Sequence, residues 1–505
     1  MATISTRSTV LAIMEETTEG TPVAPSGATS FIALQDDFAM APSSELLENA
    51  ELRNSIGKAK PIQGAENPSG SMSHYLRHSG VEGQAPNYGL LLKACLGAVA
   101  TAGTEYDTVS SSTVSVLKVN TGEGANFQRG QAALIKDSTN GYRIRALDSI
   151  SGDDLTMGFN VPNAPASGVN LGKAVVYKPA DTGHPTMTIW EYLGNGGALQ
   201  MMSGARVTSA SIDINAGELI NANYSFEGVG FYFNPITIAS ADRYIDFTDD
   251  DGTFAAAVST GVYRHPHSLA EAIQTAMNNT ASTEVYTVTY SNTTGKFSIV
   301  GTGTVLSLLW NSGANTANTI GDKIGFSVAA DDTGTAATTG YTADNAITIT
   351  APYTPSYDSS DPLAAKDNEI MIGDATDYAC FKASTVNVTI DTPKSNIASV
   401  CAESGISGSI ISERTVTMTV SALLEQYDAD KFRRFKENDE TKLQYSFGTK
   451  SGGNWVAGKC GCIYIPTATI TSWSLSDNEG SVQLDMELQA FVNSTGQGEV
   501  YVNFV

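Results

Sequence analysis

Histidine is the first place to look for acid–base or metal chemistry, because imidazole changes charge close to neutral pH. The chain has five histidines, His74, His78, His184, His265 and His267. His265 and His267 flank a proline and would need a third ligand from elsewhere in the fold to hold a metal ion. We interpret this pair as part of a turn or an exposed strand rather than as a metal site.

Cysteine is the second candidate for nucleophilic or metal chemistry. The five cysteines are Cys95, Cys380, Cys401, Cys460 and Cys462. An odd and sparse set in a long chain is not a disulfide framework and indicates synthesis in a reducing place. Cys460 and Cys462 lack the two-residue spacing and the second pair of a structural zinc site. We expect them to be small buried residues on a strand.

Two charged clusters complete the search. Asp249-Asp-Asp-Gly252 resembles the start of a calcium loop, but no glutamate follows at the required position, so a hairpin turn is the better interpretation. The basic cluster and the acids around it are Lys431, Arg433, Arg434 and Lys436 with Asp428, Asp430, Glu437, Asp439 and Glu440. Such alternation is typical of a solvated face or of salt bridges to a neighbouring subunit.

No catalytic motif accompanies these residues. The sequence has no His-Glu-x-x-His, no phosphate-binding Gly-Lys-Ser/Thr loop and no Gly-x-Ser-x-Gly elbow. We therefore predict no enzymatic activity, no cofactor, and no catalytic, cofactor-binding or metal-ligating residue. A hydrolase that uses scattered carboxylates is the remaining enzymatic alternative.

The composition describes the elements that must carry any function. The 505 residues include 29 Lys+Arg and 53 Asp+Glu, a net charge of −24, and only 16% are charged. Abundant Ser, Thr, Asn and Gly favour short strands and turns over helical bundles. The negative charge argues against tight binding of nucleic acid, although not against its passage nearby. We also expect no secretory signal and no membrane span.

We predict five segments along the chain. They are an N-terminal arm or loop at 1–68, a β domain at 69–235 with a barrel-like insertion at about 104–179, a separate α+β domain at 236–353, a linker at 354–369, and a second β domain at 370–505. The polar stretch from Asp36 to Pro68 is typical of an arm that orders on a partner. Asn140-Gly141 is a strong hairpin signal within the insertion.

Three short helices are expected among the strands. The clearest spans Ser268–Met277, where Ser268 and Glu271 have capping-box spacing and apolar residues recur every four positions. The other two are Pro86–Leu96 and the charged segment Ala429–Lys436. Helices are therefore a minor part of a mainly β chain.

Two β-hairpins in the two β domains match each other. Val207–Ile212 can be laid over Ile470–Leu475, and each segment is followed by a turn glycine, Gly217 and Gly480, at the same distance. Any two hairpins with a glycine turn look alike, which is the alternative to a duplicated domain. If the domain is duplicated, three chains of two copies would make a pseudo-sixfold ring.

Segments of both β domains also share a family pattern. They are Arg414–Val420, Phe432–Phe435, Lys442–Tyr445 and Pro466–Ser472 in the second domain, Thr186–Trp190, Gly204–Ser211 and Asn223–Gly228 in the first, and Glu15–Pro22 near the start. These segments resemble the tail tube (major tail) proteins of long-tailed bacteriophages. The resemblance implies a duplicated tail-tube-type β-sandwich or barrel domain with short helices, an inserted small β-barrel and an outward-facing accessory domain.

The resemblance also implies a function and a set of partners. It implies a structural virion subunit that forms stacked, trimeric and pseudo-hexameric rings around a lumen. The genomic DNA would pass through that lumen without tight binding. Other expected partners are the tape measure and tail terminator proteins, with assembly in the host cytoplasm.

A binding protein is the second hypothesis. In this alternative the chain is a phage or cell-surface protein that recognises glycan through residues 236–353. Its aromatic residues Tyr263, Trp310 and Tyr341 are then the first candidates for the binding site.

Overall fold

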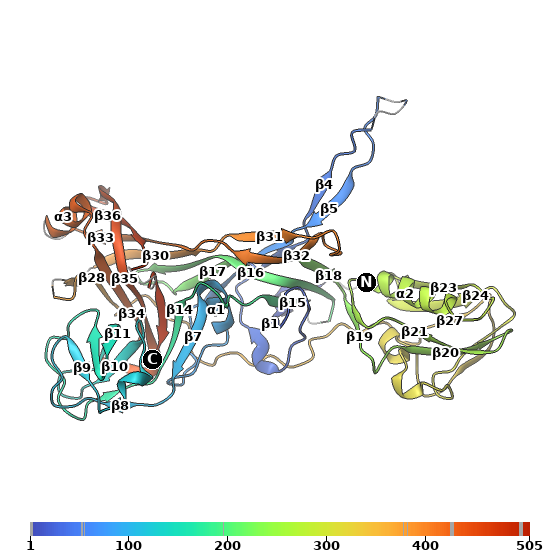
Figure 1. Cartoon of the computed structure of the whole chain (residues 1–505), viewed down its shortest axis with the longest axis horizontal. Helices are drawn as coiled ribbons and strands as arrows, with labels where there is room; N and C mark the ends of the chain where they lie inside the picture. The colour runs from blue at the N-terminus through green and yellow to red at the C-terminus, as the bar shows by residue number, and fades with distance from the viewer. Residues whose placement is uncertain are drawn as a thin grey trace. The chain divides into compact units, whose positions relative to one another are not determined.

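The computed structural model describes residues 4–51, 54, 56–194, 196–376, 378–380, 382–424, 429–493 and 498–505. It is mainly β, as the composition predicts, and its described part contains three α-helices (Figure 1). The chain divides into two compact units. The larger unit contains residues 13–188, 204–229 and 355–505, and the smaller contains residues 1–12, 189–203 and 230–354.

The larger unit is built around an antiparallel sheet. In order across it, the strands are β3 (Ala39–Ala41), β6 (Ser69–Tyr75), β17 (Asn221–Glu227), β16 (Ala198–Asn215), β30 (Ala383–Asp391), β33 (Thr415–Leu423), β36 (Ser481–Ala490) and β35 (Asn454–Asn478). Successive side chains point to opposite faces of a strand. One face of this sheet buries apolar side chains such as Met72, Ile212, Tyr224 and Val388, and the other face is polar.

A second antiparallel sheet packs on the apolar face of the first. Its strands, in order, are β7 (Gly97–Ala102), β14 (Ala174–Pro179), β37 (Tyr501–Phe504), the first half of β35, β34 (Thr441–Ser451), β28 (Glu369–Gly373) and β29 (Tyr378–Cys380). Tyr88, just before helix α1 (Gly89–Leu96), links the layers. Its ring centroid lies 4.2 Å from that of His74 and 6.2 Å from that of Phe504. The two sheets thus share one core.

A run of four strands occurs twice in the larger unit, with its outer two strands in the first sheet and its inner two in a separate two-stranded hairpin. The first repeat runs β3, β4 (Ser44–Leu47), β5 (Ile62–Glu66) and β6, and the second runs β30, β31 (Lys394–Ala398), β32 (Ile406–Ile411) and β33. Their registers match residue for residue with a shift of 348. Ala39 opposite Ser71 corresponds to Asn387 opposite Thr419, and Leu46 opposite Gln63 corresponds to Lys394 opposite Ile411.

The following hairpins, β16–β17 and β35–β36, repeat as well. Each has a β-bulge at the same place, between Val207 and Ser209 in one and between Ile470 and Ser472 in the other. The turn glycines Gly217 and Gly480 have φ of 83° and 85°, a left-handed conformation that favours glycine. A shared turn glycine alone could be coincidence, but a shared bulge and a shared strand register indicate duplication.

The predicted insertion lies between β7 and β14. It contains a six-stranded sheet of β8 (Tyr106–Asp107), β13 (Asn170–Leu171), β10 (Ala132–Lys136), β11 (Arg143–Ser151), β12 (Asp154–Met157) and β9 (Val116–Lys118). Leu117, Leu147, Leu155 and Leu171 form part of its own core. Because β7 and β14 pair with each other, the insertion occupies the place of a hairpin turn.

The smaller unit contains the α+β segment predicted at 236–353. Its strands are β18 (Gly230–Phe233), β19 (Ile236–Ile238), β20 (Tyr244–Asp249), β21 (Thr253–Ala257), β22 (Gly261–Tyr263), β23 (Tyr286–Ser291), β24 (Lys296–Gly301), β25 (Val305–Leu308), β26 (Asp332–Ala336) and β27 (Tyr341–Thr342). Helix α2 (Pro266–Asn278) packs Leu269, Ile273 and Met277 into their core.

The capping prediction for this helix was wrong. His265, not Ser268, is the N-cap residue, and its side chain accepts a hydrogen bond from the Ser268 backbone N–H. The Ser268 hydroxyl accepts a hydrogen bond from the His265 backbone N–H, so Ser268 is the third helical residue of the capping box and not its first. Pro266 explains the earlier start, because a proline fits the first helical position, where no backbone N–H is needed.

The N-terminal 68 residues contain strands that the weak sequence periodicity does not reveal. They are β1 (Val10–Glu15), β2 (Phe31–Ile32), β3, β4 and β5. Another strand, β15 (Met187–Leu193), lies much later in the chain. Leu11, Ala12 and Phe31 are buried. The β4–β5 hairpin extends from the larger unit in Figure 1, within the stretch that we expect to order on a partner.

The proline-rich segment after the α+β domain lies along the larger unit. Leu363 is buried, and its backbone donates to Leu76 and accepts from Ile220. Residues predicted as a linker therefore contribute to the core of a unit from which they were separated in our sequence assignment.

Candidate functional site

The polar face of the first sheet is the most extensive surface of uniform chemistry that we identify. It presents Ser69, Ser71, Ser73, Ser209, Ser211, Asp213, Asn221, Asn223, Ser225, Glu227, Thr385, Asn387, Thr389, Asp391, Thr417, Thr419, Ser421, Ser472, Ser474, Ser476, Gln483, Asp485, Glu487 and Gln489. We call this set the polar sheet face. Residues 69–75, 209–215, 221–227, 383–391, 415–423, 471–478 and 481–490 contain neither lysine nor arginine, and the set includes five carboxylates. Basic groups meet the set only at its margin, where Arg206 lies opposite Glu227 and Lys394 Nζ lies 3.8 Å from Glu227 Oε2.

Side-chain hydrogen bonds tie the polar sheet face together across strands. The Asp213 carboxylate on β16 accepts from Asn223 Nδ2 on β17 at 2.5 Å and from Asn387 Nδ2 on β30. Ser209 Oγ donates to Asp391 Oδ1 at 2.6 Å. One carboxylate thus links three adjacent strands, and both contacts to β30 join the first repeat to the second.

Asp485 is the corresponding carboxylate of the second repeat, but it lies on β36 at the position of Asn223, whereas Ser476 stands at the position of Asp213. Its carboxylate accepts from Ser421 Oγ and Ser476 Oγ, both at 2.6 Å, and from Gln483 Nε2 at 2.8 Å. The hydrogen bond from Ser421, followed by that from Ser476, lowers the pKa of Asp485. The group is therefore an anion at neutral pH although no cation pairs with it in these contacts.

Neither edge of this sheet pairs with a further strand among the described residues. Residues 469–478 of β35 pair with β36 on one side only, and β3 pairs with β6 on one side only. The Leu475 side chain on β35 is 47% exposed, whereas Ile212, at the same position of the first repeat, is 2% exposed. An unpaired edge is a template for a further strand.

The β31–β32 hairpin, by contrast, is fixed onto the first repeat. Arg206 Nε donates to Ser409 Oγ at 2.7 Å, and Arg206 Nη2 donates to Ser409 O and Glu19 Oε2, both at 2.9 Å. Lys394 Nζ donates to Gly228 O at 2.9 Å, with burial lowering the pKa of this amine. These contacts show how a hairpin of this repeat docks on a neighbouring repeat.

The residues first considered for chemistry have structural roles. His265 caps α2, and His267 Nε2 lies 3.2 Å from Asn292 Oδ1. Cys460 and Cys462 are buried on β35, as predicted, and burial raises the pKa of the Cys460 thiol to about 12. Across the described residues, no group of three or more His, Cys, Asp or Glu side chains could hold a metal ion.

The two charged clusters also lie in the framework. Asp249 Oδ1 accepts from the backbone N–H groups of Asp251 and Gly252, which is the hairpin turn that the sequence predicts. In helix α3 (Ala429–Glu437), Lys431 and Arg434 are buried, which corrects the interpretation of a solvated face. Arg434 Nη2 donates to Asp374 Oδ2 at 3.0 Å, because α3 packs on the sheet; Asp428 lies outside the described residues.

The aromatic residues of the glycan hypothesis pack within the smaller unit. Trp310 is 1% exposed, and its Nε1 donates to Asp332 Oδ2 at 2.9 Å. The Tyr341 hydroxyl donates to Leu306 O at 3.0 Å, and the Tyr263 hydroxyl donates to Ser259 O at 2.8 Å. These side chains do not form an exposed aromatic platform.

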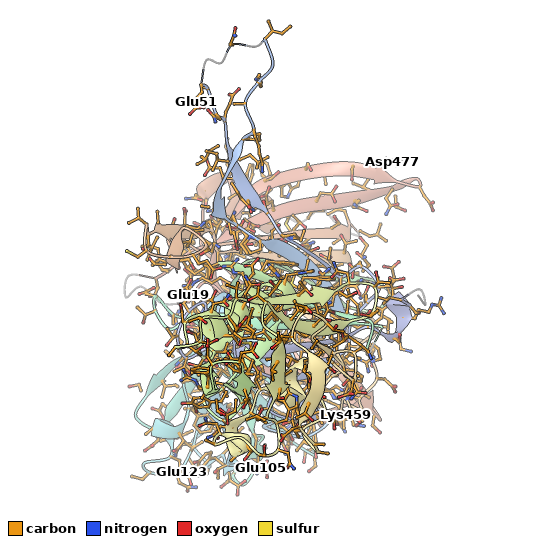
Figure 2. The ribbon with its side chains drawn as sticks, turned by 90° about the vertical axis from the view of Figure 1, so that its right-hand side faces the viewer. Glu19, Glu51, Glu105, Glu123, Lys459 and Asp477 are labelled. Atoms are coloured by element: carbon orange, nitrogen blue, oxygen red, sulfur yellow. The ribbon has the colours of Figure 1, made fainter. Side chains whose placement is uncertain are left out.

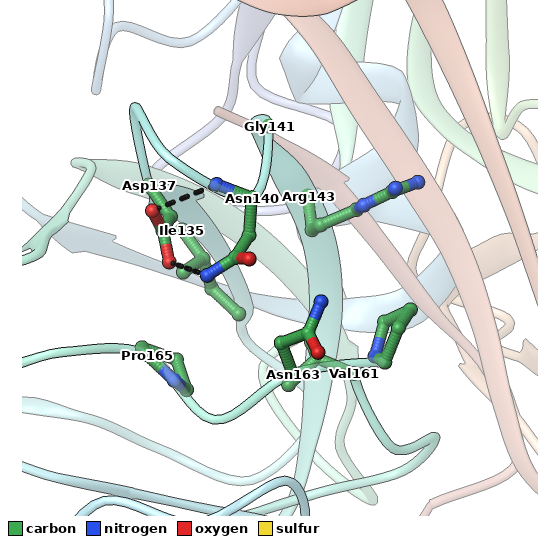
Figure 3. Close-up of a pocket in the computed structure, with 9 residues that line it drawn as sticks. Ile135, Asp137, Asn140, Gly141, Arg143, Val161, Asn163 and Pro165 are labelled. Atoms are coloured by element: carbon green, nitrogen blue, oxygen red, sulfur yellow. Dashed lines mark hydrogen bonds between the residues drawn. The ribbon is translucent and has the colours of Figure 1, made fainter.

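A small hollow lies in the insertion between β10, β11 and the following loop (Figure 3). It is lined by Ile135, Asp137, Asn140, Arg143 and Val161, among others, and its volume of about 30 Å³ suits one water molecule. Asp137 accepts from the Asn140 backbone and side chain at 3.0 and 2.9 Å. The carboxylate therefore organises a turn.

The arrangement suits a passive surface better than a reaction centre. Carboxylates and neutral hydroxyls repel or ignore a polyanion, whereas lysine and arginine would bind it. The alternation of Ser209, Ser211 and Asp213 was visible in the sequence, but the continuity of one polar face over both repeats was not. No helix in the described part of the chain has the length and apolar content that a membrane crossing needs.

Comparison with known proteins adds the following. Residues 6–242 match the model of the family described as "Phage tail tube protein". Similar solved structures include the SPP1 tail tube, with 17% identity, a TM-score of 0.21, and coverage of 26% of this chain and 76% of that chain. No curated protein matches the chain.

Two further similar structures come from gene transfer agent particles. A chain of the native virion has 11% identity and a TM-score of 0.18, with coverage of 25% of this chain and 92% of that one. A chain from the tail of an empty particle has 12% identity and a TM-score of 0.20, with coverage of 25% and 93%.

Proposed function

From the premise that residues 6–242 place this chain in the phage tail tube protein family, we propose that three copies close into a ring around a lumen for the genome. The chain is a structural component of the phage tail, and tail tube subunits associate with themselves into tubes. Stacked rings of three chains would then form the tube. The duplication supports this number, since each chain supplies two equivalent repeats to a ring of six.

The polar sheet face is the observation that carries the conduit. A tube must let DNA pass without holding it, and each lysine or arginine contact with a phosphate would slow transit. The strand segments that carry the central part of this face, such as residues 209–215 and 383–391, contain no such residue, and the basic side chains near it, Arg206 and Lys394, lie at its margin beside Glu227. Carboxylates such as Asp213 and Asp485 are held in place by neutral donors. We therefore assign this face to the lumen.

The remaining parts of the chain would lie outside the lumen. The domain at 236–353 would project from the tube. The tape measure protein would contact the interior of the tube, and the tail terminator protein would contact its end. Assembly would take place in the host cytoplasm, in keeping with the free buried thiols Cys95, Cys460 and Cys462.

Electron microscopy of the purified, polymerised protein tests the ring. Hollow stacked rings with three chains per ring, counted from mass per length, are the expected result. Monomers that stay monodisperse under all conditions would overturn the assignment.

A charge substitution tests the lumen. Ser225 and Thr419 are exposed on the polar sheet face, and S225K/T419K tubes should retain DNA that unsubstituted tubes release. Retention should weaken with salt, because each lysine–phosphate contact releases a counterion. Thr287→Lys, on an exposed position of β23 in the smaller unit, is the control and should leave DNA release unchanged.

A further inference from the structure

The junction between the two repeats shows how one repeat joins the next. β16 of the first repeat pairs with β30 of the second over seven residue pairs, from Ser209 opposite Asp391 to Asn215 opposite Thr385. At its centre Ile212 lies opposite Val388, and both side chains are buried. This junction is a complete example of an interface that the chain uses once internally.

The same two partners recur at the sheet edges. By the matched bulges and registers, residues 472–478 of β35 are equivalent to residues 209–215 of β16. Residues 37–43 around β3 are equivalent to residues 385–391 of β30. Each edge is therefore one half of the internal junction without the other half.

Backbone directions at the edges fit the missing partner. In β30, Thr392 N donates to Thr208 O and Ser384 O accepts from Ala216 N, both at 2.8 Å, so even-numbered residues face β16. In the β3 segment, Gln35 N donates to Ser73 O, and Ser43 O accepts from Asn67 N. Odd-numbered residues therefore face inward, and the backbone groups of Phe38 and Met40 face outward, because the direction alternates along a strand.

We propose that the free edge of β35 pairs with β3 of a second copy of this chain in the antiparallel register that places Leu475 opposite Met40. The register is the internal one transferred by the repeat, and it also places Ser474 opposite Ala41 and Ser476 opposite Ala39. The inference rests on the proposed ring and names its contact surface. Leu475 and Met40 then take the places of Ile212 and Val388 on the apolar face.

The β4–β5 hairpin of the second copy completes the contact. It corresponds to β31–β32, which docks on the adjacent repeat through Arg206 and Ser409. Leu46 stands where the second repeat has Lys394, whose side chain is 0% exposed, yet Leu46 itself is 69% exposed. Leu47 and Ile62 on the same hairpin are also exposed. Because Ile410, the equivalent of Ile62 on the docked hairpin, is also 53% exposed, the contrast that marks an interaction surface is that between Leu46 and Lys394.

Both surfaces are accessible in the single chain. Figure 2 shows Glu51 on the β4–β5 hairpin and Asp477 near the end of β35, each away from the bulk of the ribbon. All but one of residues 471–478 are exposed. Pro42 lies on the outward side of the β3 segment, opposite Trp473 in the proposed register, and it has no N–H, so the pairing lacks one ladder hydrogen bond at that residue.

Cysteine cross-linking tests the register. Ser474 and Ala41 form a non-hydrogen-bonded pair in the proposed register, in which Cβ atoms approach closely enough for a disulfide. In a Cys401→Ser background, which removes the exposed native thiol, oxidised A41C/S474C tubes should give dimers and trimers on non-reducing gels, ending at three chains. A39C/S474C is two residues out of register and should cross-link at least about tenfold less, since diagonal neighbours lie about 7–8 Å apart.

The internal junction supplies the positive control. S211C/T389C occupies the equivalent pair within one chain and should form a disulfide without joining chains. In the unsubstituted protein, hydrogen exchange at residues 37–43 and 469–478 should slow on polymerisation, which tests the same contact if a cysteine variant fails to fold.

The outcomes separate the inference from the function. Tubes seen by microscopy without the A41C/S474C cross-link, or with equal cross-linking at A39C/S474C, overturn the register and leave the tube intact. Tubes in which hydrogen exchange at residues 37–43 and 469–478 does not slow would also overturn the register and leave the tube intact. Failure of every preparation to form tubes overturns the proposed function.

Discussion

The junction of β16 with β30 and the free edge of β35 are the same piece of structure in two environments. Both strands carry the same bulge and are followed by the same left-handed glycine. Ala210, Ile212 and Ile214 are buried because β30 continues the sheet, whereas Leu475 is exposed because nothing in the described chain continues it. Burial here depends on the neighbouring strand and not on the strand's own sequence.

The β31–β32 and β4–β5 hairpins are a second pair of equivalent elements in different environments, and they differ in their side-chain chemistry. β31–β32 docks through Arg206, Glu19 and Ser409, a polar cluster shielded from water. β4–β5 presents Leu46, Leu47 and Ile62 instead. The internal contact is made once during folding and can be polar and specific. A contact made between chains gains more from apolar area, since its driving force must repay the entropy of association.

Of the substitutions that compare the two edges, Leu475→Asp should have the largest effect, and the property it changes is polymerisation. A carboxylate at this position would be buried without a partner in the ring, which costs more than about 4 kcal/mol, or about 1000-fold in association. The monomer should fold normally. Light scattering during polymerisation measures the loss, and Val285→Asp, at an exposed position of the smaller unit, is the control. Normal tube growth by the Leu475→Asp protein would remove β35 from the interface.

Ile212→Ala and Leu475→Ala should differ in the stability of the monomer. Removing the buried Ile212 side chain leaves a cavity and should lower the free energy of unfolding by about 3 kcal/mol. The same truncation at the exposed Leu475 should cost less than about 1 kcal/mol. Urea denaturation of dilute protein measures both values. Equal losses would mean that the β35 edge is already covered in the monomer.

Arg206→Ala should release one hairpin and leave the other unchanged. The substitution removes charged hydrogen bonds to Ser409 and Glu19, with an expected cost of about 2 kcal/mol. Hydrogen exchange should rise in residues 394–411 and at Glu66, whose backbone N–H donates to Ser404 O, and stay the same in residues 44–62. An equal change in both segments would show that Arg206 acts through global stability.

His74 should make the first repeat sensitive to acid where the second is not. Burial, with a smaller contribution from the nearby Arg77 charge, lowers the pKa of His74 to about 4, and the unfolded value is about 6.5. The unfolded chain therefore binds the proton first, and stability present above pH 6.5 is lost as the pH falls toward 4. The slope should approach about 1.4 kcal/mol per pH unit in that window.

His74→Gln should flatten this part of the pH profile in urea denaturation. The second repeat has Ala422 at the position of His74, so it offers no matching group. His78, whose pKa burial also lowers to about 4, is present in both proteins and cancels in their difference. An unchanged slope would mean that His74 is not the titrating group.

Local patterns were predicted well from the sequence. The match between the hairpins that end at Gly217 and Gly480 was found in the sequence, with coincidence as the alternative, and the shared bulge and strand register favour duplication. These features depend on residues a few positions apart, so their physical cause is contained in the segment itself. The prediction that Cys460 and Cys462 are small buried residues on a strand is confirmed for the same reason, because small apolar residues on an alternating strand are normally buried.

Features that join distant segments were predicted poorly. The start of α2 was displaced because a histidine cap is uncommon among N-cap residues. The basic cluster was interpreted as a solvated face or as a source of salt bridges to a neighbouring subunit, yet Lys431 and Arg434 are buried. Asp374, the partner of Arg434, is far away in the sequence. The strands of the first 68 residues were not predicted. β3, for example, is only three residues long, and it is a strand because it pairs with β6.

The sequence by itself therefore determined the mainly β composition and the match between the hairpins that end at Gly217 and Gly480, whereas the shared bulge and strand register indicate the two copies. Only the tertiary structure decided which strand edges are paired and which are open. The reason is that a strand's side-chain pattern specifies its two faces, whereas its edges consist of backbone groups that are the same in every residue except proline. Which edge meets which is settled by how the whole chain folds.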